Sequence, residues 1–174
     1  MLTVARSSDE LARLQERIGG YHLTADLSTG EGVDGLVDRC LAMLGHIDVW
    51  VNNAGLETSD AFVHLDRDTI RTVARLNFEA PLMLTRDVAA HMVARGSGHI
   101  VQMSSLAGTV PFPGMVAYTG TKAGLTHFTE SLRIELAGTG VGLTVVAPGP
   151  LVRRARTPPG ADRRLPPHRR SLHR

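Results

Sequence analysis

The stretch "HIVQMSSLAGTVPFPGMVAYTGTKAGLTHFTESLRIELAGTGVGLTVVA", residues 99–147, decides the fold. It opens with a run of β-branched and apolar residues at 99–105 and closes with a similar run at 141–147, and each run is typical of a buried strand. Between them, residues 117–137 carry apolar side chains at helical spacing, which predicts a helix with one apolar face. The order strand, helix, strand is the repeating unit of a parallel sheet.

The same alternation extends toward the start of the chain. We place three further strands, each buried on both faces, at 2–5, 21–25 and 47–51. We place three further helices at 7–18, 28–44 and 67–95. The sequence therefore predicts an α/β fold with a parallel sheet and helices on both of its sides.

Individual residues mark where these helices begin and end. Ser8 or Asp9 is expected to cap the first helix, and Gly96 and Gly138 are expected to end the third and fourth. Pro81 lacks a backbone N–H, so we expect the long third helix to be broken near residues 77–81.

Composition limits the class of protein. The chain has 174 residues, 43% of them apolar, with no uninterrupted apolar run long enough to cross a membrane. Its first residues match neither a secretory nor a transit signal, so we expect a cytoplasmic protein. Cys40, the single cysteine, is read as a small buried apolar residue. The histidines lack ligand spacing, so no metal site is predicted.

Charge divides the chain into two parts. Residues 1–152 have a net charge of −5, whereas residues 153–174 have +7 and are rich in Arg and Pro. We expect 1–152 to form the folded, partial dinucleotide-binding domain and 153–174 to be a disordered tail. The tail has no aromatic platform and no groove-reading element, so specific nucleic-acid binding is not expected.

The segment "YTGTKAG" contains one of two tyrosines and the only lysine of the chain. Tyr118 and Lys122 are one helical turn apart, so their side chains share a face of the predicted helix. A nearby positive charge favours the phenolate over the phenol, which makes Tyr118 a candidate proton donor and acceptor. Such pairs also occur on ordinary solvated helices, so the pair alone is a weak signal.

Polar residues follow three of the predicted strands. Ser105 ends one strand, and a hydroxyl at the carboxyl end of a parallel strand faces the binding crevice. Ser104 beside it is interpreted as closing the strand end. The segment "VNNAG", 51–55, ends another strand. Asn and Gly also occur together in ordinary turns, so the alternative to a binding role is a tight turn after the strand. Asp26 follows a third strand, where it binds a ligand or caps the next helix.

Together these motifs resemble the classical short-chain dehydrogenase/reductase (SDR) family over residues 2–151. The resemblance is carried by six features in the family's order: Asp26 with Leu27, "NNAG" at 52–55, Asn77 in a broken helix, "SS" at 104–105, Tyr118 with Lys122, and Pro148 with Gly149. It implies a Rossmann-like doubly wound parallel sheet, and hydride transfer between NAD(P) and an alcohol or carbonyl substrate.

The resemblance also implies a role for each site residue. Tyr118 would be the general acid and base, Lys122 would lower its pKa and hold the nicotinamide ribose, Ser105 would stabilise the substrate oxygen, and Asn77 would support a water in the proton relay. The residues implied in cofactor binding are Asp26, Leu27, Asn53, Ala54, Gly55, Tyr118, Lys122, Pro148, Gly149 and Leu151. Members of the family form homodimers or homotetramers, which we expect here too.

Arg6 favours NADP over NAD. Dinucleotide folds that select NAD place an acidic residue after the second strand, whereas an arginine there suits the 2′-phosphate of NADP. The chain starts at what resembles the family's second strand, so the residues that follow 2–5 occupy this place. "VARS", 4–7, supplies Arg6 and no acid there, so NADP is expected, with NAD possible.

Two parts of the family pattern are missing. No glycine-rich cofactor turn precedes the first helix, and the segment after Leu151 matches neither the substrate loop nor the last strand. We therefore expect a fold without the family's first and last strands, truncated at both ends. Its activity is then in doubt, and the alternative is an inactive fragment or an assembly partner that dimerises through the helices at 68–95 and 118–137.

Overall fold

The computed structural model describes residues 1–149 of the 174. All strand pairs within this range are parallel, as predicted. The five strands are β1 (Leu2–Ala5), β2 (Tyr21–Thr24), β3 (Val49–Asn52), β4 (Gly98–Met103) and β5 (Val141–Val146). They match the predicted positions to within two residues at each end. The predicted tail and the positions of Leu151 and Arg153 lie outside the described residues.

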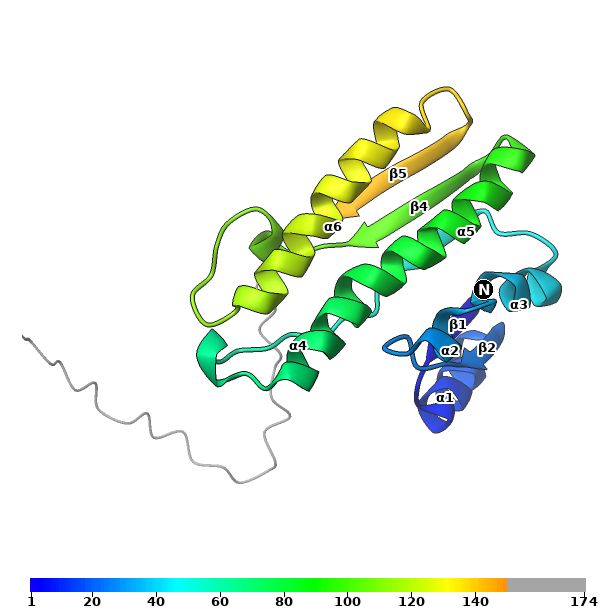
Figure 1. The fold of residues 1–174 in the computed structure, drawn as a ribbon. Coiled ribbons are helices and arrows are strands. Elements are labelled where there is room, and N and C mark those ends of the chain that lie inside the picture. Colours follow the sequence, from blue (N-terminus) through cyan, green and yellow to red (C-terminus); the bar gives the residue numbers. More distant parts are fainter. Residues whose placement is uncertain (150–174) are drawn as a thin grey trace, which may run out of the picture.

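The strands form two sheets instead of the single sheet predicted. β1 pairs with β2, and β3, β4 and β5 follow in that order in a second sheet. In Figure 1 the β1–β2 pair lies apart from β4 and β5. The division falls between β1 and β3, the two strands between which the family's first strand would lie. Since no described segment lies between them to donate and accept hydrogen bonds, the ladder is interrupted there.

The first two predicted helices differ in detail from expectation. α1 (Ser8–Ile18) is capped by Ser7, whose hydroxyl accepts a hydrogen bond from the Glu10 backbone N–H, so the prediction of Ser8 or Asp9 as the cap was wrong. The predicted helix at 28–44 is divided into α2 (Gly30–Val33) and α3 (Leu36–Leu44). Gly35 lies between them with a φ of 65°, a left-handed conformation that ends one helix before the next begins.

The long third helix deviates from regular geometry where the sequence predicted a break. It consists of α4 (Arg67–Ala74), a π-helical turn (Arg75–Glu79) and α5 (Ala80–Arg95). Pro81 lies in the first turn of α5, where its missing N–H costs least. Gly96 ends α5 in a left-handed conformation, as predicted.

The last described helix is α6 (Val116–Glu135), which lies beside α5 along β4 and β5 (Figure 1). Its C-cap is Leu136, two residues before the Gly138 that was expected to end it. Short 3₁₀ turns at Phe62–His64 and Leu106–Gly108 join these elements. None of the helices in the described range is both long and apolar enough to cross a membrane.

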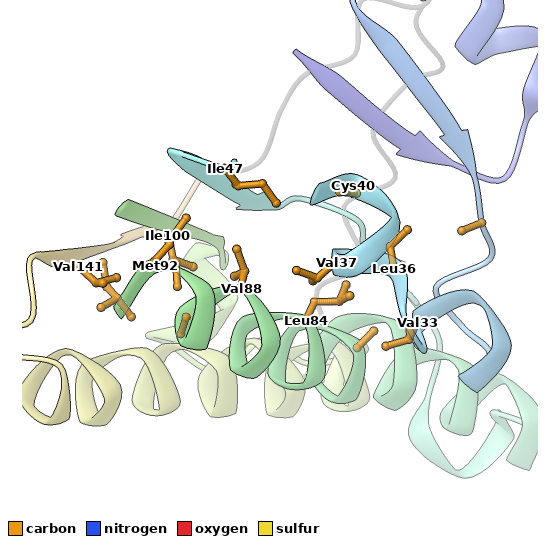
Figure 2. Packing of buried hydrophobic residues seen from close by; sticks show 14 residues of the cluster. Val33, Leu36, Val37, Cys40, Ile47, Leu84, Val88, Met92, Ile100 and Val141 are labelled. Carbon is orange, nitrogen blue, oxygen red and sulfur yellow. The ribbon is translucent and has the colours of Figure 1, made fainter. Parts of the chain in front are cut away.

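The main core lies between α5 and the three-stranded sheet. Val88, Met92 and Ile100 are fully buried there, and Figure 2 shows the cluster extending along α5 to Val37 and Leu36. The cluster includes Cys40, which is 1% exposed, and burial raises the pKa of its thiol. The prediction of a buried apolar role for Cys40 is confirmed.

The opposite face of this sheet is open in the described range. Val49 and Val51 of β3 are 58% and 51% exposed. Asn52 of the same strand, which faces α5, is buried. The prediction of strands buried on both faces was therefore wrong for β3. The reason is that α5 and α6 cover one face of the three-stranded sheet, and no described helix packs on the other.

A polar network is buried within this core. The Asn52 Nδ2 and Gln102 Nε2 groups both donate to the Thr85 hydroxyl, at 2.9 Å and 2.7 Å. The Trp50 indole donates to Asn52 Oδ1 at 2.8 Å. Because Asn52 begins the "NNAG" segment, this network fixes the end of β3 against α5.

Candidate active site

Tyr118 and Lys122 lie together on the first turns of α6. The Lys122 ammonium is 5.8 Å from the centre of the Tyr118 ring, so the two groups face each other as the sequence predicted. Lys122 is 4% exposed, and its Nζ donates a 2.7 Å hydrogen bond to the Met103 carbonyl at the end of β4. Burial lowers the pKa of Lys122 to about 8. This charge is therefore held in place by the sheet and poorly solvated.

The end of β4 is fixed against α6 by Ser104. Ser104 is 5% exposed, and its hydroxyl is 2.7 Å from the Thr126 hydroxyl and donates to the Lys122 carbonyl at 3.1 Å. Gly108 comes so close that a Cβ there would lie 2.6 Å from the Ser104 hydroxyl oxygen. These contacts agree with the structural interpretation of Ser104.

Ser105 begins the 3₁₀ turn that packs on α6. Its side-chain oxygen accepts a hydrogen bond from the Ala107 backbone N–H at 3.2 Å, which leaves the hydroxyl proton able to point elsewhere. The Leu106 N–H donates to the Pro148 carbonyl at 2.9 Å, so the segment with Pro148 and Gly149 lies beside this turn. The structure thus brings Ser105 and Pro148 to the end of the sheet where Lys122 lies.

Asn77 connects the loop after β3 to α6. It is fully buried in the π-helical turn, where its side-chain amide exchanges two hydrogen bonds with the Leu56 backbone, at 2.8 Å and 2.9 Å. Its Nδ2 also donates to the Thr121 hydroxyl at 3.3 Å. A Cβ on Gly55 would lie 3.3 Å from Asn77 Oδ1 and 3.4 Å from Lys122 Nζ, so the Gly55 backbone lies against both side chains. A π-turn is often found at functional sites because it redirects a side chain.

The remaining predicted residues line a cleft between β1 and β3, with a volume of about 960 Å³, which we call the β1–β3 cleft. The residues of the sequence prediction that line it are Arg6, Asp26, Leu27, Asn53, Ala54 and Gly55. Gly55 therefore joins the cleft to the Tyr118–Lys122 pair.

Asp26 keeps its charge at one end of the β1–β3 cleft. Its carboxylate accepts hydrogen bonds from the Ser28 hydroxyl at 2.6 Å and the Ser28 N–H at 2.9 Å. These bonds, with a smaller contribution from Arg6, lower the pKa of Asp26. Thr29 caps the following helix, so the alternative of Asp26 as the N-cap was wrong.

Three parts of the site were missed by sequence reasoning. The Met103 carbonyl and the Leu56 backbone hold Lys122 and Asn77, but a backbone group carries no signal in the residue type. Thr121, which bonds Asn77, could have been noticed because it lies within the "YTGTK" segment. Among residues 1–149, no group of three or more His, Cys, Asp or Glu side chains could hold a metal ion.

Comparison with protein families gives a match over most of the chain. The sequence model of the family described as short chain dehydrogenase matches residues 1–161. The ketoacyl reductase HetN of Nostoc sp. is 35% identical over 154 residues, which is 86% of this chain and 54% of that protein. The chain spans about half the length of the curated relatives it matches.

Solved structures agree with this match. A short-chain dehydrogenase from Streptomyces avermitilis superposes with a TM-score of 0.81 at 34% identity, covering 86% of this chain and 57% of that chain. A metagenomic short-chain oxidoreductase in complex with NADP superposes with a TM-score of 0.78 at 32% identity, covering 84% of this chain and 69% of that chain.

Proposed function

The chain belongs to the short-chain dehydrogenase family, and on that basis we propose that it is an NADP-dependent oxidoreductase acting on an alcohol or carbonyl compound. The observation that carries the proposal is the Tyr118–Lys122 pair, with its 5.8 Å separation and its anchor on the Met103 carbonyl. The similar metagenomic oxidoreductase was solved in complex with NADP, which supports this choice of cofactor, and NAD is the alternative.

The described residues fit the two ends of NADP. Arg6 supplies a cation for the 2′-phosphate, and Asp26 with Leu27 would flank the adenine. Gly55 presents backbone beside Lys122, which leaves room for a ribose close to the ammonium. We assign Asn53, Ala54, Pro148 and Gly149 to the path between these ends. Leu151, outside the described residues, is proposed for the nicotinamide end. When bound, NADP would supply or accept the hydride.

The proton in this reaction would move at Tyr118 Oη. In the reductive direction Tyr118 donates its proton to the substrate oxygen, and in the oxidative direction it accepts one. Ser105 would donate a hydrogen bond to the same oxygen, since its own oxygen already accepts from Ala107. Lys122 stabilises negative charge on the tyrosine oxygen, and Asn77 holds the loop that positions Gly55. A water supported by Asn77 is part of the proposal.

The two tyrosines of the chain provide a matched test. We expect Tyr118→Phe to reduce NADPH oxidation with a panel of ketones by about 10²–10⁴-fold, the usual contribution of a general acid. Tyr21→Phe, on β2, should leave the rate unchanged because Tyr21 is 50% exposed and far along the chain from the site. Equal rates for the two variants would contradict the assignment of Tyr118.

Arg6 tests the choice of NADP. A hydrogen-bonded charge is worth about 1.5–3 kcal/mol, so Arg6→Ala should raise the KM for NADPH at least about tenfold without changing that for NADH. Arg13→Ala on the exposed face of α1 is the control. A wild-type chain that prefers NADH would show that NAD is the cofactor.

A second candidate function is assembly with another copy of the chain or with a related subunit. It is favoured by a groove of about 490 Å³ between α5 and α6, lined mainly by apolar side chains that include Leu82, Val93 and Phe128. Homodimers or homotetramers formed through these helices, and a cytoplasmic location, are part of the proposal. Sedimentation equilibrium of the wild type and of Val93→Asp tests it, because a charge in the groove should shift a dimer to monomer.

A further inference from the structure

We propose that the substrate carries an uncharged apolar group next to its reacting carbon, and that this group lies against the segment 104–118. This segment follows β4 and includes the first turn of α6 (Figure 1). The inference rests on the proposed function and adds the class of substrate to it. The segment contains both Ser105 and Tyr118, between which the substrate oxygen would lie. Its other side chains are therefore placed next to the rest of the substrate.

The charges around this segment disfavour an anionic substrate. Residues 104–118 include no Asp, Glu, Lys or Arg. The loop after β3 contacts the segment, because the Asp60 N–H donates to the Gly114 carbonyl at 2.9 Å. Residues 53–66 of that loop include three acidic side chains and no Lys or Arg. A carboxylate or phosphate on the substrate would therefore meet negative charge, without the cations that usually bind such groups.

The Lys122 ammonium does not supply the missing cation. It is buried, and its Nζ already donates to the Met103 carbonyl at 2.7 Å. In the proposed reaction its charge also stabilises the phenolate form of Tyr118. An anionic substrate group at Lys122 would compete with both of these interactions.

Exposed apolar side chains lie beside the polar groups of the site. Leu106, next to Ser105, is 40% exposed, and Val110 is 44% exposed. The two belong to one turn, since the Val110 N–H donates to the Leu106 carbonyl at 3.1 Å. Leu56, whose backbone bonds Asn77, is also exposed. Apolar side chains around a few polar groups are typical of a small-molecule site, and they favour an apolar substrate group that leaves water there.

Met115 brings a further apolar side chain to the helix face of Tyr118. Its N–H donates to the Phe112 carbonyl at 3.2 Å, and Gly114 has a φ of 80°, so residues 112–115 form a type II turn. This turn ends where α6 begins. Met115 precedes Tyr118 by three residues, so their side chains are neighbours on the helix surface. The flexible thioether side chain of methionine adapts to apolar groups of different shapes.

The test compares two ketones of equal length. They are methyl hexyl ketone and 7-oxooctanoate, in which a carboxylate replaces the terminal methyl group. Both are measured by NADPH oxidation and, independently of turnover, by binding to the ¹⁵N-labelled 174-residue chain with and without NADP, read from the amide shifts of residues 104–118. We expect methyl hexyl ketone to be favoured at least about tenfold in kcat/KM and in affinity, because burying a carboxylate without a partner is costly. Methyl butyl ketone should be weaker by about fourfold for each CH₂ group removed.

Met115→Lys and Ile134→Lys are a matched pair of variants. Each adds an ammonium group to α6 or its first turn, but Ile134 is 79% exposed and lies more than four turns beyond Tyr118. Met115→Lys should shift the preference toward 7-oxooctanoate by about two- to fivefold, the usual strength of an exposed ion pair. A gain for this ketone cannot come from misfolding. Ile134→Lys should leave the preference unchanged, because salt screens its charge over that distance.

The results separate this inference from the proposed function. NADPH oxidation that is as fast with 7-oxooctanoate as with methyl hexyl ketone, or faster, would overturn the inference and leave the proposed function standing. No oxidation with any ketone would count against the proposed function, and binding would then decide the inference. Shifts in 104–118 that favour methyl hexyl ketone support it, whereas equal affinities or no shifts overturn it. Equal changes of preference in Met115→Lys and Ile134→Lys would overturn it as well.

Discussion

Replacing Lys122 by methionine tests how strongly its buried ammonium opposes folding. Burial lowers the pKa of Lys122 from its ordinary value of 10.5 to about 8. Below pH 8 the amine is charged in both the folded and the unfolded chain, and above pH 10.5 it is neutral in both. Between these values the unfolded chain binds more protons, so the free energy of unfolding should rise with pH.

The size of this effect follows from the pKa difference. Each pKa unit corresponds to about 1.4 kcal/mol, so a fall from 10.5 to about 8 amounts to roughly 3 kcal/mol. Methionine has a similar length and no titratable group. We therefore expect Lys122→Met to be more stable than the wild type at pH 7, by an amount that the lost hydrogen bond to Met103 reduces. That advantage should shrink by about 3 kcal/mol between pH 8 and pH 10.5.

The assay is urea denaturation of both proteins at a series of pH values from 7 to 10.5, followed by Trp50 fluorescence. Taking the difference between the two proteins cancels the titration of every shared group. A difference in unfolding free energy that stays constant across this range would refute the reasoning, because it would show that the Lys122 amine is as well solvated in the folded chain as in the unfolded one.

Three further substitutions test the packing around the site. Gly120→Ala in α6 should stabilise the chain by about 0.5–1 kcal/mol in thermal unfolding, because a Cβ there meets nothing within 4 Å and alanine is the better helix former; a loss of stability would mean that the helix is distorted at this point. Gly32→Ala should destabilise it by more than about 1 kcal/mol, since its Cβ would overlap the Asp26 carbonyl oxygen, whereas Gly30→Ala, with 3.8 Å of space, should not. Thr85→Val leaves two buried amide donors without an acceptor at about 1–3 kcal/mol each, whereas Thr85→Ser keeps the acceptor; equal chemical denaturation midpoints for the two variants would contradict the buried network.

The strand positions could be predicted because they depend on local information. Runs of β-branched and apolar residues at 2–5, 21–25 and 141–147 indicate a strand regardless of which other strand each one pairs with. The observed strands lie at these positions. Gly96 could be predicted as a helix end for the same local reason, since glycine accepts a left-handed backbone without strain. Ser7 was missed as a cap because three neighbouring polar residues could all serve, and only the backbone geometry chooses between them.

Taken by itself, the sequence was sufficient for the order of the elements and for the spacing that puts Tyr118 and Lys122 on one helix face, because both follow from the period of a helix. Only the tertiary structure decided that Lys122 is held by the Met103 carbonyl, that Asn77 anchors the loop at Leu56, and that the strands divide into two sheets. Those features depend on backbone groups meeting across long sequence distances. Such groups are the same in every residue, so the letters of the sequence do not distinguish them.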